Sequence, residues 1–233
     1  MAHDGGDEAE PLVLGWSGGK DSALVLARLM DDASVHVAAL LTTVTEGYDR
    51  VSIHGVRRTL LHAQGRALGI PVVEVPIPAA CTNASYERAM ADALADVRAR
   101  FPGVRRLAFG DVHLADVRAY REAQVASAGF GALFPLWGGA PDALADEVLA
   151  RGIRARLVCV DTEQLDASFA GRAYDRALLR DLPPGIDPCG ERGEFHTFVS
   201  AGPGFAAPVA HRVGETVLRD ARFAYTDLLD GEE

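Results

Sequence analysis

The chain has 233 residues, 48% of them hydrophobic and 24% charged, a balance that excludes a disordered or fibrous protein. Its formal net charge of −10 argues against broad, nonspecific binding to RNA or DNA, and no apolar run is long enough to span a membrane. Cys81, Cys159 and Cys189 lie far apart in the sequence, which argues against a disulfide framework or a zinc site and makes a reduced cytoplasm the expected compartment.

An acidic, polar stretch opens the sequence. Residues 1–10 have the features of neither a signal peptide nor a basic transit peptide, and we expect them to form a loose tail. Residues 11–16 form a short apolar run that predicts a buried strand. Residues 23–30, whose apolar positions are Leu24, Val25, Leu26 and Leu29, predict a helix. The segment between them therefore joins a strand to a helix.

That segment, Ser17-Gly18-Gly19-Lys20-Asp21-Ser22, has the composition of an anion site. The start of a helix presents free backbone N–H groups and the positive end of the helix dipole. The glycines let the backbone approach an anion closely, the serines add hydroxyl donors, and the lysine adds a positive charge. Because the spacing matches neither the P-loop nor the dinucleotide fingerprint, we predict a different phosphate-binding loop rather than an ordinary turn.

Strand and helix patterns alternate through the first half of the chain. We expect strands at residues 35–43, 72–75, 105–109 and 131–135, and a polar loop at residues 44–52. We expect helices at residues 53–68, stopped by Gly69 and Pro71, at 86–100, capped by Ser85, and at 115–128. This alternation predicts a Rossmann-like α/β fold, a parallel sheet with helices on both faces. Thr42, Gly110 and Asp111 end strands of that sheet, so we expect them to share one crevice with the loop at residues 17–22.

The pattern changes near Trp137. We expect a helix at residues 141–151, strands at 154–160, 194–200, 209–218 and 222–227, and a long Gly/Pro-rich segment at 183–193. These elements predict a smaller α+β C-terminal region. The expected organisation is a tail at residues 1–10, an N-terminal domain at 11–136 and a C-terminal domain at 137–233.

A dense group of polar residues occupies positions 187–197. Glu191, Glu194 and His196 stand close to Gly190 and Gly193. The glycines allow a tight loop whose charged side chains could contact a polar substrate, but a solvated turn before a hairpin explains the same composition.

Residues 17–22 resemble the PP-loop of the ATP pyrophosphatases. Residues 190–197, Gly-Glu-Arg-Gly-Glu-Phe-His-Thr, resemble the GE-x-GE-(Y/F)-x-T signature of the diphthine–ammonia ligase family, except that Phe195 and His196 stand where Tyr and Glu often occur. The segments Gly110-Asp111, Tyr120-Arg121 and Pro135-Leu136-Trp137 resemble further segments of that family. The resemblance extends from the first strand to about Gly204.

The resemblance implies a Rossmann-like (HUP-type) ATP-binding domain and a family-specific C-terminal domain on the substrate side. It also implies an amide-forming ligase that uses ATP and Mg²⁺. Such an enzyme adenylates a carboxylate with release of pyrophosphate, then amidates it with ammonia and releases AMP. The family's named acceptor is diphthine, a modified histidine of elongation factor 2.

The resemblance also suggests roles for individual residues. Ser17, Gly18, Gly19, Lys20, Asp21, Ser22, Thr42 and Gly110 would bind the nucleotide. Catalytic roles would fall to Lys20, Asp21, Asp111, Glu191 and Glu194, with Asp21, or else Asp111, holding Mg²⁺. Glu191, Glu194 and His196 would orient the acceptor or take a proton from ammonium, and Arg121 would reach a phosphate or the acceptor carboxylate. A helix cap for Asp21 and a surface position for Arg121 are equally good interpretations, and Cys189 has no evident activating partner.

Three other functions remain open at the level of sequence. A related enzyme could adenylate a small metabolite acid, or it could modify tRNA, although the acidic composition and unpaired cysteines argue against RNA. A sensor could bind an adenine nucleotide without turnover. Free ammonium is the expected nitrogen source, and the size of the chain is compatible with a homodimer.

Overall fold

The computed structural model describes residues 9–231, so most of the predicted tail lies outside the described residues. The N-terminal elements are β1 (Glu10–Gly15), α1 (Lys20–Met30), β2 (Val35–Thr45), β3 (Arg50–Val51), α2 (Arg58–Leu68), β4 (Val72–Ile77), α3 (Asn83–Arg100), β5 (Arg106–Ala108), α4 (Ala115–Ser127) and β6 (Gly131–Leu133). The C-terminal elements are α5 (Pro141–Ala150), β7 (Arg154–Asp161), a 3₁₀ turn (Ala167–Phe169), β8 (Ala173–Tyr174), α6 (Arg176–Asp181), β9 (Phe195–Ala201), β10 (His211–Arg219) and β11 (Phe223–Asp230).

Five strands of the N-terminal region form a parallel sheet in the order β4-β2-β1-β5-β6, which confirms the predicted α/β class. The short β3 pairs antiparallel with the last two residues of β2. The strand order reverses between β1 and β5, because the chain first builds outward through β2 and β4 and then returns to the other side of β1. Ligands of such sheets bind beyond the carboxyl ends of the strands at this reversal.

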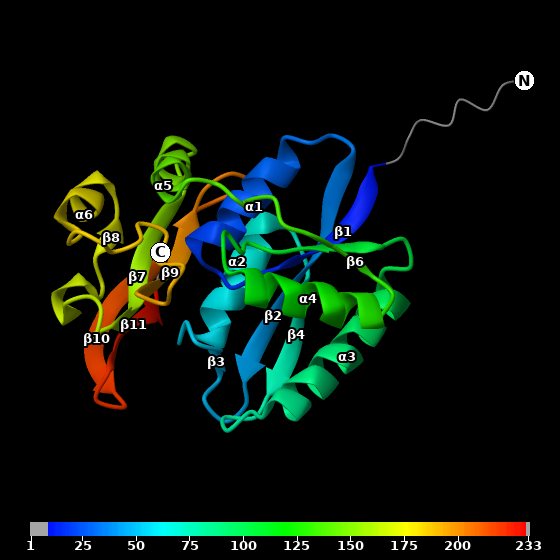
Figure 1. Cartoon of the computed structure of the whole chain (residues 1–233), viewed down its shortest axis with the longest axis horizontal. Helices are drawn as coiled ribbons and strands as arrows, with labels where there is room; N and C mark the ends of the chain where they lie inside the picture. Colours follow the sequence, from blue (N-terminus) through cyan, green and yellow to red (C-terminus); the bar gives the residue numbers. More distant parts are fainter. Residues whose placement is uncertain (1–8, 232–233) are drawn as a thin grey trace, which may run out of the picture.

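Helices cover both faces of the parallel sheet (Figure 1). Successive side chains of a strand point to opposite faces, and β1 follows this rule. Leu12 and Leu14 belong to the core that contains α1 and α2. Val13, which lies between them, belongs to the core that contains α3 and α4.

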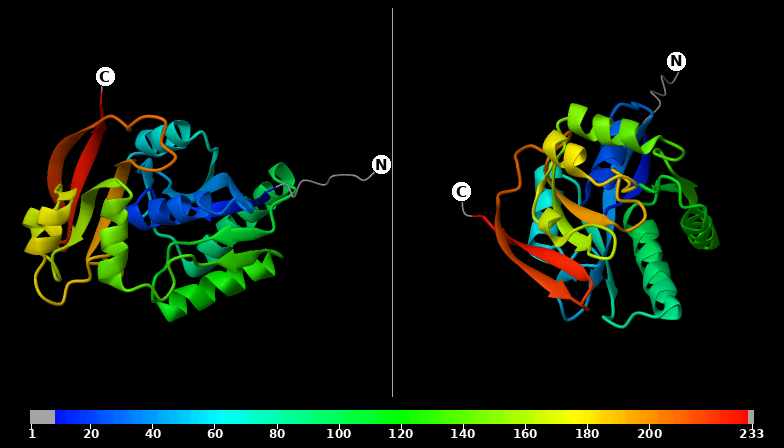
Figure 2. Two further views of the ribbon diagram at one scale, coloured as in Figure 1. Left: turned by 90° about the horizontal axis from the view of Figure 1, so that it is seen from above. Right: turned by 60° about the vertical axis from the view of Figure 1, so that its left-hand side comes forward.

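The C-terminal region contains a separate antiparallel sheet in the order β10-β11-β7-β8, with β9 also paired to β7. The two sheets lie at opposite sides of the molecule (Figure 2). One hydrophobic core nevertheless runs from β1 through α1 into β7 and β9. Of the eleven residues of α1, eight are buried, as expected of a helix that packs against structure on more than one side.

The described elements differ from the predicted ones chiefly in the following places. The helix predicted at residues 53–68 begins only at Arg58, because Ile53 and Gly55 adopt positive φ angles of 66° and 68°. The predicted loop at residues 44–52 contains the end of β2 and the short β3. Thr82, rather than Ser85, caps α3 and accepts a hydrogen bond from the Ser85 N–H. The short elements β8 and α6 were not predicted.

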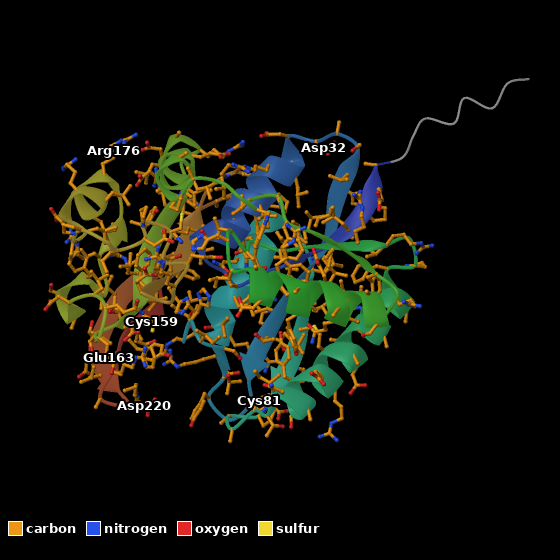
Figure 3. All side chains as sticks on the ribbon, viewed as in Figure 1. Asp32, Cys81, Cys159, Glu163, Arg176 and Asp220 are labelled. Carbon is orange, nitrogen blue, oxygen red and sulfur yellow. The ribbon has the colours of Figure 1, made fainter. Side chains whose placement is uncertain are left out.

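The three cysteines are free, and Figure 3 shows Cys81 and Cys159 in different regions of the molecule. Cys81 follows β4, whereas Cys159 lies within β7. Among the described helices, none combines the length and the apolarity that crossing a membrane requires.

Candidate functional site

A cavity of about 540 Å³ lies at the carboxyl ends of the parallel strands. Its walls come from the loop after β1, the end of β2, the segment after β5 and residues 189–197 before and within β9. The structure therefore brings the PP-loop-like segment at residues 17–22 and the signature at residues 190–197 to one site. Lys20 and Thr197, which are in contact there, are 177 positions apart in the sequence.

The loop after β1 is held by strand β9. The Gly18 carbonyl accepts a hydrogen bond of 2.8 Å from the Val199 N–H, and the Lys20 N–H donates one of 3.0 Å to the Thr197 hydroxyl. The Gly19 N–H donates to the Ser17 hydroxyl at 3.2 Å. Two N–H groups that the sequence suggested were free for an anion therefore have partners within the protein.

Gln64 of α2 also holds the loop after β1 in place. It is fully buried, accepts a hydrogen bond of 2.9 Å from the Trp16 indole and donates to the carbonyls of Gly18 and Val199 at 3.0 and 2.6 Å. Sequence reasoning missed this residue. The signal was a glutamine that follows Leu60 and Leu61 on the apolar stripe of the helix, since a buried amide must find partners.

Lys20 is only 2% exposed, and its ammonium group is enclosed by the C-terminal region. Nζ lies 2.9 Å from the Asp21 carboxylate, hydrogen-bonds to the Cys189 carbonyl, and lies 5.6 and 5.4 Å from the ring centroids of Tyr174 and Phe195. Burial is the largest single influence and disfavours its charged form, but the charge and hydrogen bond of Asp21, together with neighbouring acidic groups such as Glu191, outweigh it and raise the pKa of Lys20 above its ordinary 10.5. Lys20 is thus a buried cation that connects the loop after β1 to the C-terminal region.

Asp111 and Glu191 add two carboxylates to the cavity wall. Glu191 accepts a hydrogen bond of 2.8 Å from the Val112 N–H, and burial, with the charges of Asp21 and Asp111, raises its pKa. The Arg121 Nε lies 2.8 Å from Asp111 Oδ2, yet neither atom makes a hydrogen bond to another described residue. The Arg121 guanidinium also stacks over Phe109, 4.9 Å from the ring centroid.

Glu194 does not line the cavity. It is 1% exposed, and its carboxylate accepts hydrogen bonds of 3.1 and 2.9 Å from the backbone N–H groups of Asp187 and Arg192. Gly190 occupies the same loop with φ of +67°. The two glutamates of the signature therefore differ in position: Glu191 faces the cavity, and Glu194 holds the loop in shape.

His196 lies beside His54, with the ring centroids 4.7 Å apart, and both side chains line the cavity. Burial lowers the pKa of His54 to about 4 and that of His196 to about 3. Sequence reasoning missed His54, which precedes Gly55 in the turn before α2. A histidine in a glycine turn just beyond a strand end was the available signal.

Part of the cavity wall is apolar and includes Leu41, Ile77, Tyr86, Met90 and Phe109. Thr42, which follows Leu41, is buried, and its hydroxyl donates a hydrogen bond of 2.7 Å to the Trp16 carbonyl. Gly110 lies against the start of α1, where a Cβ atom would approach Asp21 within 3.3 Å. Cys189 remains a thiol, because burial raises its pKa to about 12.

Two family models match the chain. The one described as the diphthamide synthase N-terminal domain matches residues 11–129, and the one described as the diphthamide synthase C-terminal domain matches residues 140–217. A search of curated proteins found no match. Because the two matched regions include every side chain of the cavity, fold and site agree with one assignment: the chain belongs to the diphthamide synthase family, a family of ATP-dependent ligases.

Proposed function

We propose that this protein activates a carboxylate with ATP by forming an acyl-adenylate, and then converts it to an amide with ammonia. One observation carries the proposal: the PP-loop-like segment and the family signature line the same cavity at the strand reversal. A phosphate-binding loop and an acceptor-binding loop must be adjacent if a carboxylate is to attack the α-phosphate.

The cavity has suitable chemistry for ATP along its length. The apolar wall formed by Leu41, Ile77 and Met90 suits a purine ring, since nucleotide pockets combine apolar surfaces with a few polar groups. Ser17 and Ser22 also line the cavity, at the start of α1, with their hydroxyl oxygens 3.4 Å apart. The positive end of the helix dipole favours phosphate there.

Asp111 is the carboxylate best placed to hold Mg²⁺. Its buried Oδ2 makes no hydrogen bond and has the Arg121 Nε 2.8 Å away, so Mg²⁺ would take the place of that ion pair, whereas the Asp21 carboxylate already accepts hydrogen bonds from Lys20. No cluster of three metal-ligating side chains occurs in residues 9–231, and Mg²⁺ at nucleotide sites takes one or two carboxylates together with phosphate oxygens. When bound, the ion would offset the charge that grows on the phosphates.

The proposed reaction has two steps. An oxygen of the acceptor carboxylate attacks the α-phosphorus, the bond to the β-phosphate oxygen breaks, and pyrophosphate leaves. Ammonia then attacks the acyl carbon, the bond from that carbon to the AMP oxygen breaks, and the nitrogen loses a proton. Glu191 is proposed to take this proton, since its raised pKa makes it a better base than an ordinary glutamate. Arg121 is proposed to orient the acceptor.

The test incubates the purified protein with Mg-ATP and ammonium, with and without elongation factor 2 that carries diphthine, and separates AMP, ADP and pyrophosphate. The expected result is AMP and pyrophosphate that rise with the factor. Asp111→Asn should lower turnover by about 100-fold or more, and the exposed control Asp92→Asn should leave it unchanged.

The other outcomes distinguish the alternatives. AMP and pyrophosphate that do not respond to the factor would retain adenylation and indicate a small carboxylic acid as acceptor. ADP as the product, or nucleotide binding without turnover, would contradict attack at the α-phosphate and favour a nucleotide sensor.

A further inference from the structure

The histidine pair, His54 and His196, stands directly against the phosphate-binding loop. The two rings are 4.7 Å apart, and a Cβ atom added to Gly19 would lie 3.2 Å from the His54 ring. The pair therefore faces the space in which the proposed function puts the phosphates of ATP.

Near the histidine pair, the loop after β1 has few hydrogen-bond donors that are not already engaged. The N–H groups of Gly19 and Lys20 donate to hydroxyl oxygens, and the Lys20 ammonium group is engaged by Asp21 and Cys189. A pyrophosphate group carries several negative charges, so it requires further donors close to the loop. Besides the hydroxyls of Ser17 and Ser22, the two imidazoles are side chains of the same cavity wall that could supply such donors.

The hydrogen bonding of His54 fixes which of its nitrogens faces the cavity as an acceptor. Nδ1 lies 3.1 Å from the Thr197 carbonyl oxygen, which can only accept, so Nδ1 carries the proton. In the neutral ring Nε2 then has a lone pair and repels a phosphate oxygen. Neither nitrogen of His196 hydrogen-bonds to another described residue. Each ring needs a further proton before both of its nitrogens can donate.

We propose that His54 and His196 form a second wall of the anion site and bind the pyrophosphate group of ATP, taking up protons as it binds. In the proposed ligase reaction, the two protonated histidines would neutralise part of the charge of the pyrophosphate before it is released. It rests on that function only for the identity of the anion.

The charged and titratable groups around the histidine pair determine whether pyrophosphate binding weakens or strengthens as the pH rises. Lys20 and Asp21 of α1 face His54, Cys159 of β7 pairs with His196 in register, and Tyr225 of β11 packs against Gly55. Cys159 and Tyr225 stay neutral, because burial raises the pKa of each. In the free protein, burial keeps the pKa of both histidines far below 6.5, and Lys20 adds to this effect.

An anion beside the rings raises their pKa, because it stabilises the imidazolium form. A group whose pKa rises on binding strengthens binding at low pH, and this gain is lost as the pH rises through the pKa in the complex. Pyrophosphate affinity should therefore fall with rising pH, by up to tenfold per pH unit for each proton taken up.

The experiment measures the binding of inorganic pyrophosphate by calorimetry between pH 5.5 and 8.5, in buffers of different ionisation enthalpy. The wild type should take up more protons on binding than either variant, a difference in which the ionisation of pyrophosphate itself cancels. His54→Gln and His196→Gln should bind at least about tenfold more weakly at pH 6, and less so at pH 8, with reduced proton uptake. Glutamine keeps a donor for the Thr197 carbonyl, and the exposed His36→Gln is the matched control.

The histidine Cε1–H resonances provide a readout that a merely structural role would not move. In the wild type, two of them should titrate at higher pH once pyrophosphate is added, and each variant should remove one of the two. A urea midpoint near that of the wild type would confirm that the variants are folded.

Pyrophosphate affinities of both variants equal to that of the wild type at every pH, or absence of pyrophosphate binding by the wild type, would overturn the proposal. Its failure is distinct from failure of the proposed function. Proton-linked pyrophosphate binding without AMP formation would retain the histidine pair and reject the ligase reaction. AMP formation with unaffected variants would do the reverse.

Discussion

At the scale of single residues, the most informative side chain is the one lysine of the sequence. The chain uses arginine 22 times and lysine only at position 20. An arginine fork is larger and flatter than an ammonium group, and the space between Tyr174, Phe195 and the Cys189 carbonyl accommodates a compact cation. The choice of lysine therefore follows from the packing around Nζ.

This environment predicts that Lys20 resists amine-modifying reagents. Only the neutral amine is nucleophilic, and both burial and a raised pKa keep the Lys20 amine inaccessible and charged. After treatment with an acetylating reagent at pH 8, peptide mapping should show Lys20 unmodified in the native protein and modified in urea. Modification at equal rates in both states would contradict the enclosed position.

Glu194 provides a second prediction at this scale. Replacing it by glutamine removes an acceptor oxygen and sets an amide against one of the two N–H groups that it now binds. A buried N–H group left without a partner costs about 1–3 kcal/mol, so the free energy of unfolding should fall by that amount.

Urea denaturation of Glu194→Gln measures this loss. The control Glu163→Gln changes a side chain that is 67% exposed, and it should stay within about 0.5 kcal/mol of the wild type. Equal stability of the two variants would mean that the Glu194 carboxylate does not organise the loop.

At the scale of elements, the loop before β9 depends on backbone geometry. Gly190 and Gly185 both adopt positive φ angles, of +67° and +91°. A Cβ atom at Gly190 would lie 2.8 Å from the Phe195 carbonyl oxygen, whereas at Gly185 it would meet no atom within 4 Å. The two glycines therefore separate the cost of the backbone conformation from the cost of a steric clash.

Both alanine variants should lose about 1–2 kcal/mol of stability from the left-handed conformation. Gly190→Ala should lose about 1–3 kcal/mol more from overlap and should weaken nucleotide binding. Thermal unfolding and nucleotide titration of both variants check this difference. If Gly185→Ala were as damaging as Gly190→Ala, the close approach to Phe195 would not be the cause.

The same scale shows which parts of the structure the sequence predicts. The alternation of apolar runs predicts the parallel sheet, because the period of two or 3.6 residues is a local property. It does not predict that β9 binds the loop after β1, since a hydrogen bond between Lys20 and Thr197 depends on the whole fold. From the sequence, Lys20 was expected to face phosphates. Its contacts with Tyr174 and Phe195 could not be foreseen, because they too depend on the whole fold.

His54 was missed for a different reason. Its position depends on the positive φ angles of Ile53 and Gly55, which delay the start of the expected helix to Arg58. A positive φ angle is uncommon for a β-branched residue such as Ile53. The resemblance to a family identified the residues of the loop and the signature, but it said nothing of a histidine outside both.

At the scale of the whole molecule, the cavity exists only while the N-terminal and C-terminal regions stay together. Helix α1 packs into one core with both sheets, and ion pairs reinforce the contact at the edges. Arg28 binds Glu147 with Nη2 2.5 Å from Oε2, and Arg50 and Arg57 both bind Asp227. The site is therefore sensitive to changes far from the loop.

Asp227 connects this interface to the histidine pair. It accepts hydrogen bonds of 2.9 Å from Arg50 and of 3.1 and 2.7 Å from Arg57, and Arg50 also donates to the Gly55 carbonyl next to His54. Partial burial disfavours its charged form, but the two arginines hold the pKa of Asp227 at about 2, below its ordinary 3.8. The carboxylate is thus more stable when charged in the folded protein than in the unfolded chain.

Asp227→Asn should lower the free energy of unfolding by about 1–2 kcal/mol at pH 7, since charge-assisted hydrogen bonds are lost at a partly exposed site. A group with a depressed pKa stabilises the fold above its ordinary pKa, and this contribution is lost as the pH falls through the folded value. The difference between wild type and variant should therefore be complete above pH 4 and shrink toward pH 2. Urea denaturation at several pH values measures it, with the exposed Asp92→Asn as control. Arg50 also donates a hydrogen bond to the Gly55 carbonyl, so Asp227→Asn should bind pyrophosphate more weakly than the control at pH 6. Equal affinities of variant and control would mean that the turn keeps His54 in place without the interface.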